Sequence, residues 1–224
     1  MDQYLQPTWF IDSDSPTISS WASDVTAAAT GPSDRAVALY TDVRDRIRYD
    51  PYQVVRNPDH YRASAVLTSE SNWCIPKAVL LAAGARVVGI PSRLGFADVL
   101  NHLASDKLRE TMDNDLFVRH GFTELYLDDR WVRVTPTFNR ELCERFGLKT
   151  LDFDGHNDAL FHPFDQAGNK HMEYVSYYPS AADLPLDEIL RDLRAAYGEL
   201  TGERHDPVFH PGEASQSNDR AGNQ

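Results

Sequence analysis

Apolar residues recur at helical spacing in several stretches of the chain. After Ser33, a favourable N-cap, four apolar residues from Val37 to Ile47 fall three or four positions apart. Pro51 disfavours helical geometry in the residue before it, so we expect this helix to end near Tyr49. A second run follows Cys74 and should stop at Gly89. Similar patterns predict helices over 63–67, 104–112, 139–146 and 186–200.

Other stretches favour strands, because apolar and polar residues alternate or β-formers cluster there. We expect strands over 8–11, 92–99, 117–127, 130–134 and 171–178. Asp128-Asp129 is a hairpin signal between two of them, and residues 13–16 are typical of a turn. Helices come early and hairpin-like strands follow, which favours an α+β architecture over alternating parallel units.

The chain shows no internal repeat and no interdomain linker. We therefore expect a single domain over residues 1–202. Beyond Gly202 only Val208 and Phe209 are strongly apolar, so residues 203–224 are expected to form a disordered tail.

Composition excludes several classes of protein. The net charge of −12, without a basic cluster, argues against nucleic acid as a partner. No apolar run approaches the roughly 20 residues of a membrane span, and the first residues lack the regions of a secretory signal, so we expect a cytoplasmic protein without membrane contact. Two cysteines make no disulfide framework. The oligomeric state is left open.

Cys74 and His120 are the clearest candidates for catalytic residues. Cys74 lies at the predicted start of a helix, with Asn72 as a capping candidate and Pro76 in the first turn. Unpaired N–H groups at a helix start lower the pKa of a thiol and can hold an oxyanion. His120 opens a predicted strand and would hold the thiolate as an ion pair, then protonate a leaving amine. The alternative is that Cys74 is a buried core residue.

Residues from about 47 to 137 resemble the transglutaminase-like superfamily, whose members are related to papain-like cysteine proteases. The resemblance rests on Cys74 with an Ala/Leu-rich helix, then Gly-Ile-Pro-Ser-Arg over 89–93. It continues with His120-Gly-Phe-Thr-Glu-Leu, Trp131, and Thr-Pro-Thr over 135–137. It implies a papain-like α+β fold with Cys74 at the start of a helix packed on an antiparallel sheet.

The resemblance also implies a reaction. This is acyl transfer through a thioester on Cys74, with His120 as base and then acid, on a small amide or peptide. No metal or organic cofactor is implied, and hydrolysis and transamidation remain open. An inert binding or scaffold domain is the competing reading.

The chain departs from the family pattern at the third catalytic position, where Thr135 stands in place of an aspartate. A threonine hydroxyl can orient an imidazole but carries no charge. Asn139, or a carboxylate such as Asp152 or Asp154, is an alternative orienting group. The side chains of Asn72, Trp73 and Tyr61, besides the Cys74 backbone N–H, are candidates for holding the oxyanion.

Four further features have structural explanations that compete with functional ones. The segment 152–165 is rich in Asp and His and is read as a polar loop, with a metal site or a cover over the cleft as alternatives. His102 is read as a structural histidine, with the catalytic base as its alternative. Arg93 is read as an ion-pair partner rather than a substrate ligand, and Cys143 as a small buried residue.

Overall fold

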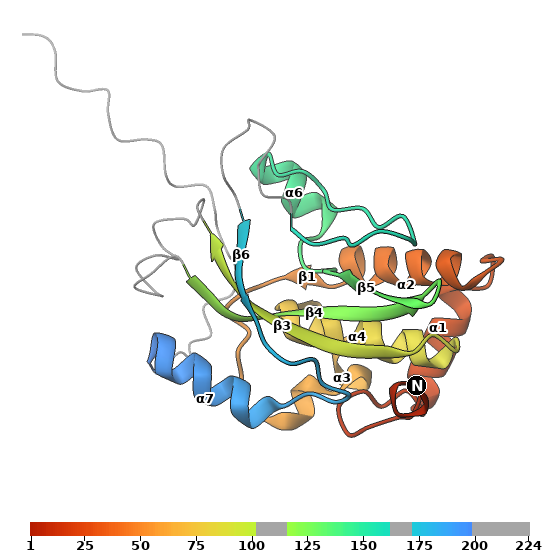
Figure 1. Cartoon of the computed structure of the whole chain (residues 1–224), viewed down its shortest axis with the longest axis horizontal. Coiled ribbons are helices and arrows are strands. Elements are labelled where there is room, and N and C mark those ends of the chain that lie inside the picture. The colour runs from red at the N-terminus through yellow and green to blue at the C-terminus, as the bar shows by residue number, and fades with distance from the viewer. Residues whose placement is uncertain (102–115, 162–171, 199–224) are drawn as a thin grey trace, which may run out of the picture.

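The computed structural model describes residues 1–101, 116–161 and 172–198 (Figure 1). Four antiparallel strands form a sheet in the order β5-β4-β3-β6, and a separate pair, β1 and β2, is parallel. The strands are β1 (Arg48–Tyr49), β2 (Ser71–Asn72), β3 (Ser92–Asn101), β4 (Leu116–Leu127), β5 (Arg130–Val134) and β6 (Met172–Tyr177). The α-helices are α1 (Pro16–Val25), α2 (Pro32–Arg46), α3 (Ala63–Leu67), α4 (Cys74–Val87), α6 (Arg140–Phe146) and α7 (Leu186–Tyr197), and two short 3-10 helices are η1 (Asp2–Tyr4) and η2 (Pro58–Tyr61).

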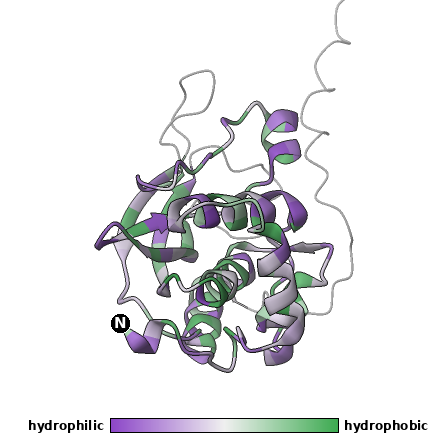
Figure 2. Cartoon of the chain, turned by 90° about the vertical axis from the view of Figure 1, so that its right-hand side faces the viewer, coloured by the Kyte–Doolittle hydropathy of each residue, from purple (hydrophilic) through white to green (hydrophobic). Residues whose placement is uncertain are grey.

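Helix α4 is the centre of the fold. It is apolar around its whole circumference, which is typical of a helix enclosed on every side, and its residues from Cys74 to Arg86 are all buried. Helices α1, α2 and α3 pack around it, and strands β3 and β4 cover another side. Figure 2 shows the hydrophobic residues gathered in the helices at the middle of the molecule.

Two close contacts fix how β4 lies on α4. The Thr123 hydroxyl donates to the carbonyl oxygen of Ala78 at 2.9 Å. Gly121 lies against Ile75, where a Cβ at position 121 would come within 2.6 Å of Ile75 Cγ1 and 3.1 Å of Ile75 Cα. The missing side chain of Gly121 therefore allows the strand to approach the first turn of the helix.

Most of the elements expected from the sequence are confirmed. The antiparallel hairpin of β4 and β5 turns at Asp128 and Asp129, whose φ angles of 48° and 59° are those of a tight hairpin turn. Gly89 and Gly147 both have positive φ after the helices that they were expected to end. The α+β architecture expected from the order of elements is confirmed as well.

Three expectations near the N-terminus are wrong in whole or in part. Residues 8–11 form a turn and no strand, because the Thr8 side chain accepts the Ile11 N–H and so competes with sheet pairing. Residues 13 and 14 do form a turn, in which the Ser15 N–H donates to the Asp12 carbonyl oxygen at 2.9 Å, but Pro16 already begins helix α1, because proline is well suited to the first position of a helix. Helix α2 begins at Pro32 after Gly31 rather than at Ser33, and it ends before Arg48 because β1 pairs with β2.

Some expectations fall on other parts of the chain. The helix over 104–112, His102, residues 162–165 of the Asp/His-rich segment and the tail 203–224 lie outside the described residues. None of the helices in residues 1–101, 116–161 and 172–198 combines the length and apolarity needed to cross a bilayer.

We predict that Gly121→Ala destabilises the protein by about 1–3 kcal/mol, because the new methyl group overlaps the first turn of α4. Urea unfolding measures the loss. The matched comparison is Ile75→Ala, alone and combined with Gly121→Ala. The double variant should lose less than the sum of the two single losses, because the Ile75 side chain is part of the clash. Additive losses would contradict this packing argument.

Candidate active site

Cys74 is the first residue of α4, and its side chain is joined to strand β4. The thiol Sγ accepts a hydrogen bond from the backbone N–H of Gly121 at 3.5 Å. Gly121 is the residue that follows His120, so the sulfur lies against the part of β4 that carries this histidine. N–H groups of Gly121, Ile75 and Cys74 itself lower the pKa of the thiol, but burial outweighs them and raises that pKa to about 11. With 6% of Cys74 exposed, the resting side chain is an uncharged thiol.

His120 occupies an irregular point of β4. The preceding residue, Arg119, has a φ of 58°, and its N–H bonds the carboxylate of Asp98 at 3.1 Å, where the register of β3 and β4 shifts. Such bulges redirect side chains and are frequent beside active sites. The His120 ring packs on Phe161 and Tyr174, with centroid distances of 4.7 and 6.0 Å.

The imidazole is also uncharged in this environment. His120 is 6% exposed, its Nε2 is buried without a hydrogen-bond partner, and burial lowers its pKa to about 3. Burial thus favours the neutral thiol and imidazole over the ion pair expected from the sequence.

Thr135 is held in place from several directions directly after β5. Its N–H donates to the Ala159 carbonyl oxygen at 2.9 Å, and its own carbonyl oxygen accepts from the Tyr40 hydroxyl at 3.1 Å. Its hydroxyl oxygen lies 3.5 Å from that of Tyr174, the residue whose ring faces His120. Tyr174 thus connects Thr135 with His120, a role that no pattern in the sequence indicates.

Lys77 is a buried cation one turn into α4. Its Nζ donates to three carbonyl oxygens, those of Arg44 at 2.9 Å, Ile47 at 2.5 Å and Thr137 at 2.9 Å. It thereby ties the helix that begins with Cys74 to the segment that carries Thr135. A lysine inside an otherwise apolar helix is a sequence signal that could have drawn attention to this residue.

The sequence match is consistent with this arrangement. Residues 19–136, more than half of the 224 residues, match the transglutaminase-like superfamily (Transglut_core). The chain belongs to this superfamily. The resemblance inferred from the motifs around Cys74 and His120 is thereby confirmed, and so is the papain-like fold class that it implied.

The solved structures to which the chain is similar share little of its sequence. One is a proposed cysteine protease from Cytophaga hutchinsonii, with 16% identity and a TM-score of 0.46 over 79% of this chain and 52% of that one. Another is the periplasmic domain of TgpA from Pseudomonas aeruginosa, with 20% identity and a TM-score of 0.42 over 59% of this chain and 45% of that one. The chain spans about half the length of these proteins. No protein with a curated description matches it in sequence.

The alternative orienting groups of this transglutaminase-like domain have other partners. Asn139 Oδ1 accepts the backbone N–H of Tyr49 at 3.1 Å. Asp152 is paired with the guanidinium groups of Arg44 and Arg140 at 2.7 and 3.2 Å. Asp154 accepts hydrogen bonds from its own turn, which lower its pKa to about 2. Among the described residues, no hydrogen bond joins these three side chains to His120.

The candidate oxyanion donors differ in whether their hydrogen-bonding groups already have partners. The Asn72 side chain accepts the Trp73 backbone N–H at 3.2 Å and donates to Ser69 Oγ at 3.4 Å. The Tyr61 hydroxyl donates to the Val55 carbonyl oxygen at 2.8 Å. Trp73 Nε1 is buried near that hydroxyl without a hydrogen bond of good geometry, so its N–H remains available to a ligand.

The remaining sequence candidates have structural roles in the part of the chain that the structure describes. Arg93 pairs with Glu124 and lies 4.1 Å from the centre of the Trp131 ring. Cys143 is a buried free thiol. His156 of the Asp/His-rich segment pairs with Asp128 at 2.9 Å, and the described residues contain no group of three or more His, Cys, Asp or Glu that could hold a metal ion.

We predict that Lys77→Met lowers the free energy of unfolding by about 2–4 kcal/mol at pH 7, because three buried carbonyl oxygens lose their donor. Burial lowers the pKa of Lys77 from 10.5 to about 7. Between these pH values the unfolded chain binds more protons, so this residue makes stability rise with pH over that window. Urea unfolding from pH 7 to 10 should show a smaller rise in Lys77→Met than in the wild type. The exposed Lys149→Met is the control, and parallel curves for wild type and Lys77→Met would contradict the assignment.

Proposed function

We propose that this transglutaminase-like domain transfers an acyl group from an amide or peptide through a thioester on Cys74. The observation that carries the proposal is the hydrogen bond from Gly121 to the Cys74 sulfur, which ties a nucleophile at a helix start to the strand that bears His120. Membership of the superfamily supports the same reading.

In the first step, Cys74 Sγ attacks the carbonyl carbon of the amide while His120 takes the thiol proton. Backbone N–H groups at the start of α4 are available for the developing oxyanion. The C–N bond then breaks, and the imidazolium gives its proton to the departing amine. In the second step, His120 takes a proton from water or another amine as that molecule attacks the thioester carbon. The C–S bond then breaks, and the imidazolium returns the proton to the Cys74 sulfur, which restores the thiol.

The uncharged resting state decides how His120 takes part. Because burial raises the thiol pKa and lowers the imidazole pKa, proton transfer has to accompany the attack instead of preceding it. The half-buried Phe161 packs on the imidazole and so covers one side of it.

An inert binding domain is the competing function, and one observation favours it. The third catalytic position holds the uncharged Thr135, and its hydroxyl lies near a Tyr174 phenol whose pKa is raised by burial rather than near a carboxylate. The two functions differ in whether Cys74 accepts an acyl group.

We predict that p-nitrophenyl acetate transfers one acetyl group per chain to Cys74, detected by mass spectrometry of the quenched protein. Cys74→Ala should lose the acetyl group, and His120→Ala should slow acetylation by roughly 10²–10⁴-fold because the general base is missing. Cys143→Ala is the matched control and should leave the rate unchanged, since that buried thiol has no role in the proposal. Acetylation of Cys143 alone, or of neither thiol, would favour the inert domain.

We predict that Thr135→Asp raises the pKa of His120 and increases the acetylation rate by at least about tenfold, because a carboxylate stabilises the imidazolium. Thr135→Asn has a similar size without the charge and should not produce either effect. The pH dependence of acetylation measures both quantities. Equal rates and pH profiles for the two variants would show that charge at position 135 does not act on His120.

A further inference from the structure

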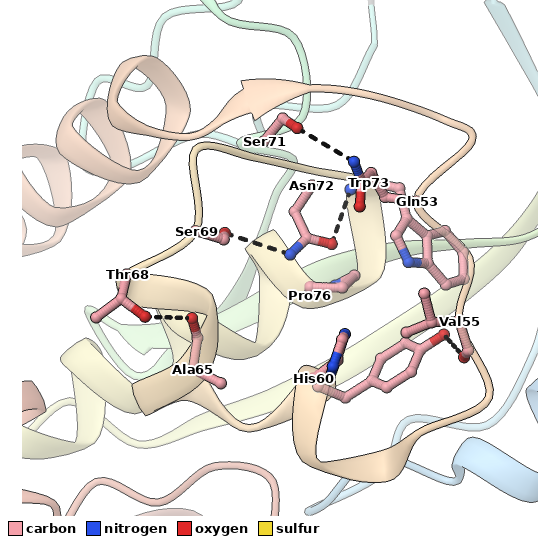
Figure 3. Close-up of a pocket in the computed structure, with 11 residues that line it drawn as sticks. Gln53, Val55, His60, Ala65, Thr68, Ser69, Ser71, Asn72, Trp73 and Pro76 are labelled. Atoms are coloured by element: carbon pink, nitrogen blue, oxygen red, sulfur yellow. Dashed lines mark hydrogen bonds between the residues drawn. The ribbon is translucent and has the colours of Figure 1, made fainter. Parts of the chain in front are cut away.

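A cavity of about 310 Å³ lies beside the first turn of α4 (Figure 3). The chain from residue 53 to residue 76 forms its walls, including parts of η2, α3 and β2. In Figure 3 the indole of Trp73 stands on one side, and Thr68 and Ser69 lie on the opposite side. The volume is at the lower end of the range for ligand pockets and is suited to a group no larger than one or two amino-acid residues.

The lining of this cavity mixes apolar and polar surface, with the apolar share somewhat larger, and carries no permanent charge. No Asp, Glu, Lys or Arg side chain is among the lining residues. Its polar members are Gln53, His60, Thr68, Ser69, Ser71 and Asn72. A charged group that entered would lose hydration without gaining an opposite charge, which is costly.

The unused hydrogen-bonding capacity defines the ligand further. Thr68 and Ser69 donate their hydroxyl protons to the carbonyl oxygens of Ala65 and Val66 at 2.9 and 2.7 Å, so toward a ligand these hydroxyls are acceptors. Trp73 Nε1 is a buried donor without a well-placed partner. The complement is a small uncharged group that both donates and accepts, such as a hydroxyl or an amide.

The cavity reaches the candidate nucleophile through two residues. Trp73 and Pro76 both line it, and Cys74 lies between them in the first turn of α4. Cys74 itself does not line the cavity, so a ligand there lies beside the first turn of α4, while the sulfur faces β4.

We propose that this cavity binds an uncharged polar side chain of the substrate, next to the amide carbonyl that Cys74 attacks, and rejects charged side chains. The proposal rests on the proposed function and adds the substrate's chemical class. In this proposal, His60 and Trp73 determine which substrate side chains are accepted.

The test uses the full chain and p-nitrophenyl esters of N-acetylated amino acids. The serine and asparagine esters should acylate Cys74 at least about tenfold faster than the lysine and glutamate esters, each rate being divided by the ester's own rate of hydrolysis. His60→Leu should reduce this preference by about threefold to tenfold, the effect of one lost hydrogen bond. His156→Leu, another exposed histidine but remote from the cavity lining, is the matched control and should leave the preference unchanged.

Acetylation by p-nitrophenyl acetate separates the two proposals, because that ester has no side chain for the cavity. Suppose that p-nitrophenyl acetate acetylates Cys74 but the amino-acid esters show no preference, or that His156→Leu alters the preference as much as His60→Leu. The cavity proposal is then overturned, and the acyl-transfer proposal stands. If p-nitrophenyl acetate does not acetylate Cys74, the acyl-transfer proposal fails. Binding of small ligands to the cavity is then measured from the Trp73 indole N–H signal in NMR titrations of Cys74→Ser. N-acetylserine N-methylamide should shift that signal at concentrations at least about tenfold below the lysine analogue, and equal shifts or none would overturn the cavity's selectivity.

Discussion

Complete enclosure of helix α4 is the constraint on which the rest of the structure depends. Because α4 is apolar on every side apart from Lys77 and Arg86, it lies inside the molecule, and helices α1, α2 and α3 and strands β3 and β4 pack around it. This fixes the place of its first residue, Cys74, against the strand that holds His120. Lys77 strengthens the arrangement, because one ammonium group binds two carbonyl oxygens at the end of α2 and one in the segment after β5.

The same enclosure sets the electrostatics of the site. Charged forms are costly in a dry interior, and both the thiol and the imidazole are held in their uncharged forms. A hydroxyl at position 135 fits such a site, because an unpaired aspartate there would also need to be stabilised as a buried charge. Instead of an aspartate, the uncharged side chains of Thr135 and Tyr174 lie next to each other beside His120. The proposed reaction therefore depends on charge that appears only while the substrate is being attacked.

The cavity and the Cys74 thiol lie on two sides of the same short segment, residues 72–76. Asn72, Trp73 and Pro76 line the cavity, and Cys74 between them points its sulfur toward β4. This division gives the segment two tasks that share one backbone, recognition on one side and chemistry on the other. A substitution at Trp73 would consequently affect both, whereas His60 belongs to the cavity wall alone.

Features that depend on a few adjacent residues could be predicted from the sequence. The hairpin at Asp128-Asp129, the glycine stops at 89 and 147, and the helix that starts at Cys74 follow from backbone preferences of a few adjacent residues. The order of motifs around Cys74 and His120 was sufficient to indicate the superfamily. Pro16 shows the limit of local reading, since the same Ser-Pro pair suits a turn and a helix start, and the buried side of α1 decides between them.

Only the tertiary structure decided which distant groups meet. That Tyr174 lies between Thr135 and His120, that Lys77 joins three segments, and that Asn139 and Asp152 are occupied elsewhere all depend on packing between residues far apart in the chain. Burial likewise reversed the expected charge state of Cys74 and His120. Desolvation depends on everything that surrounds a group, which no short stretch of sequence contains.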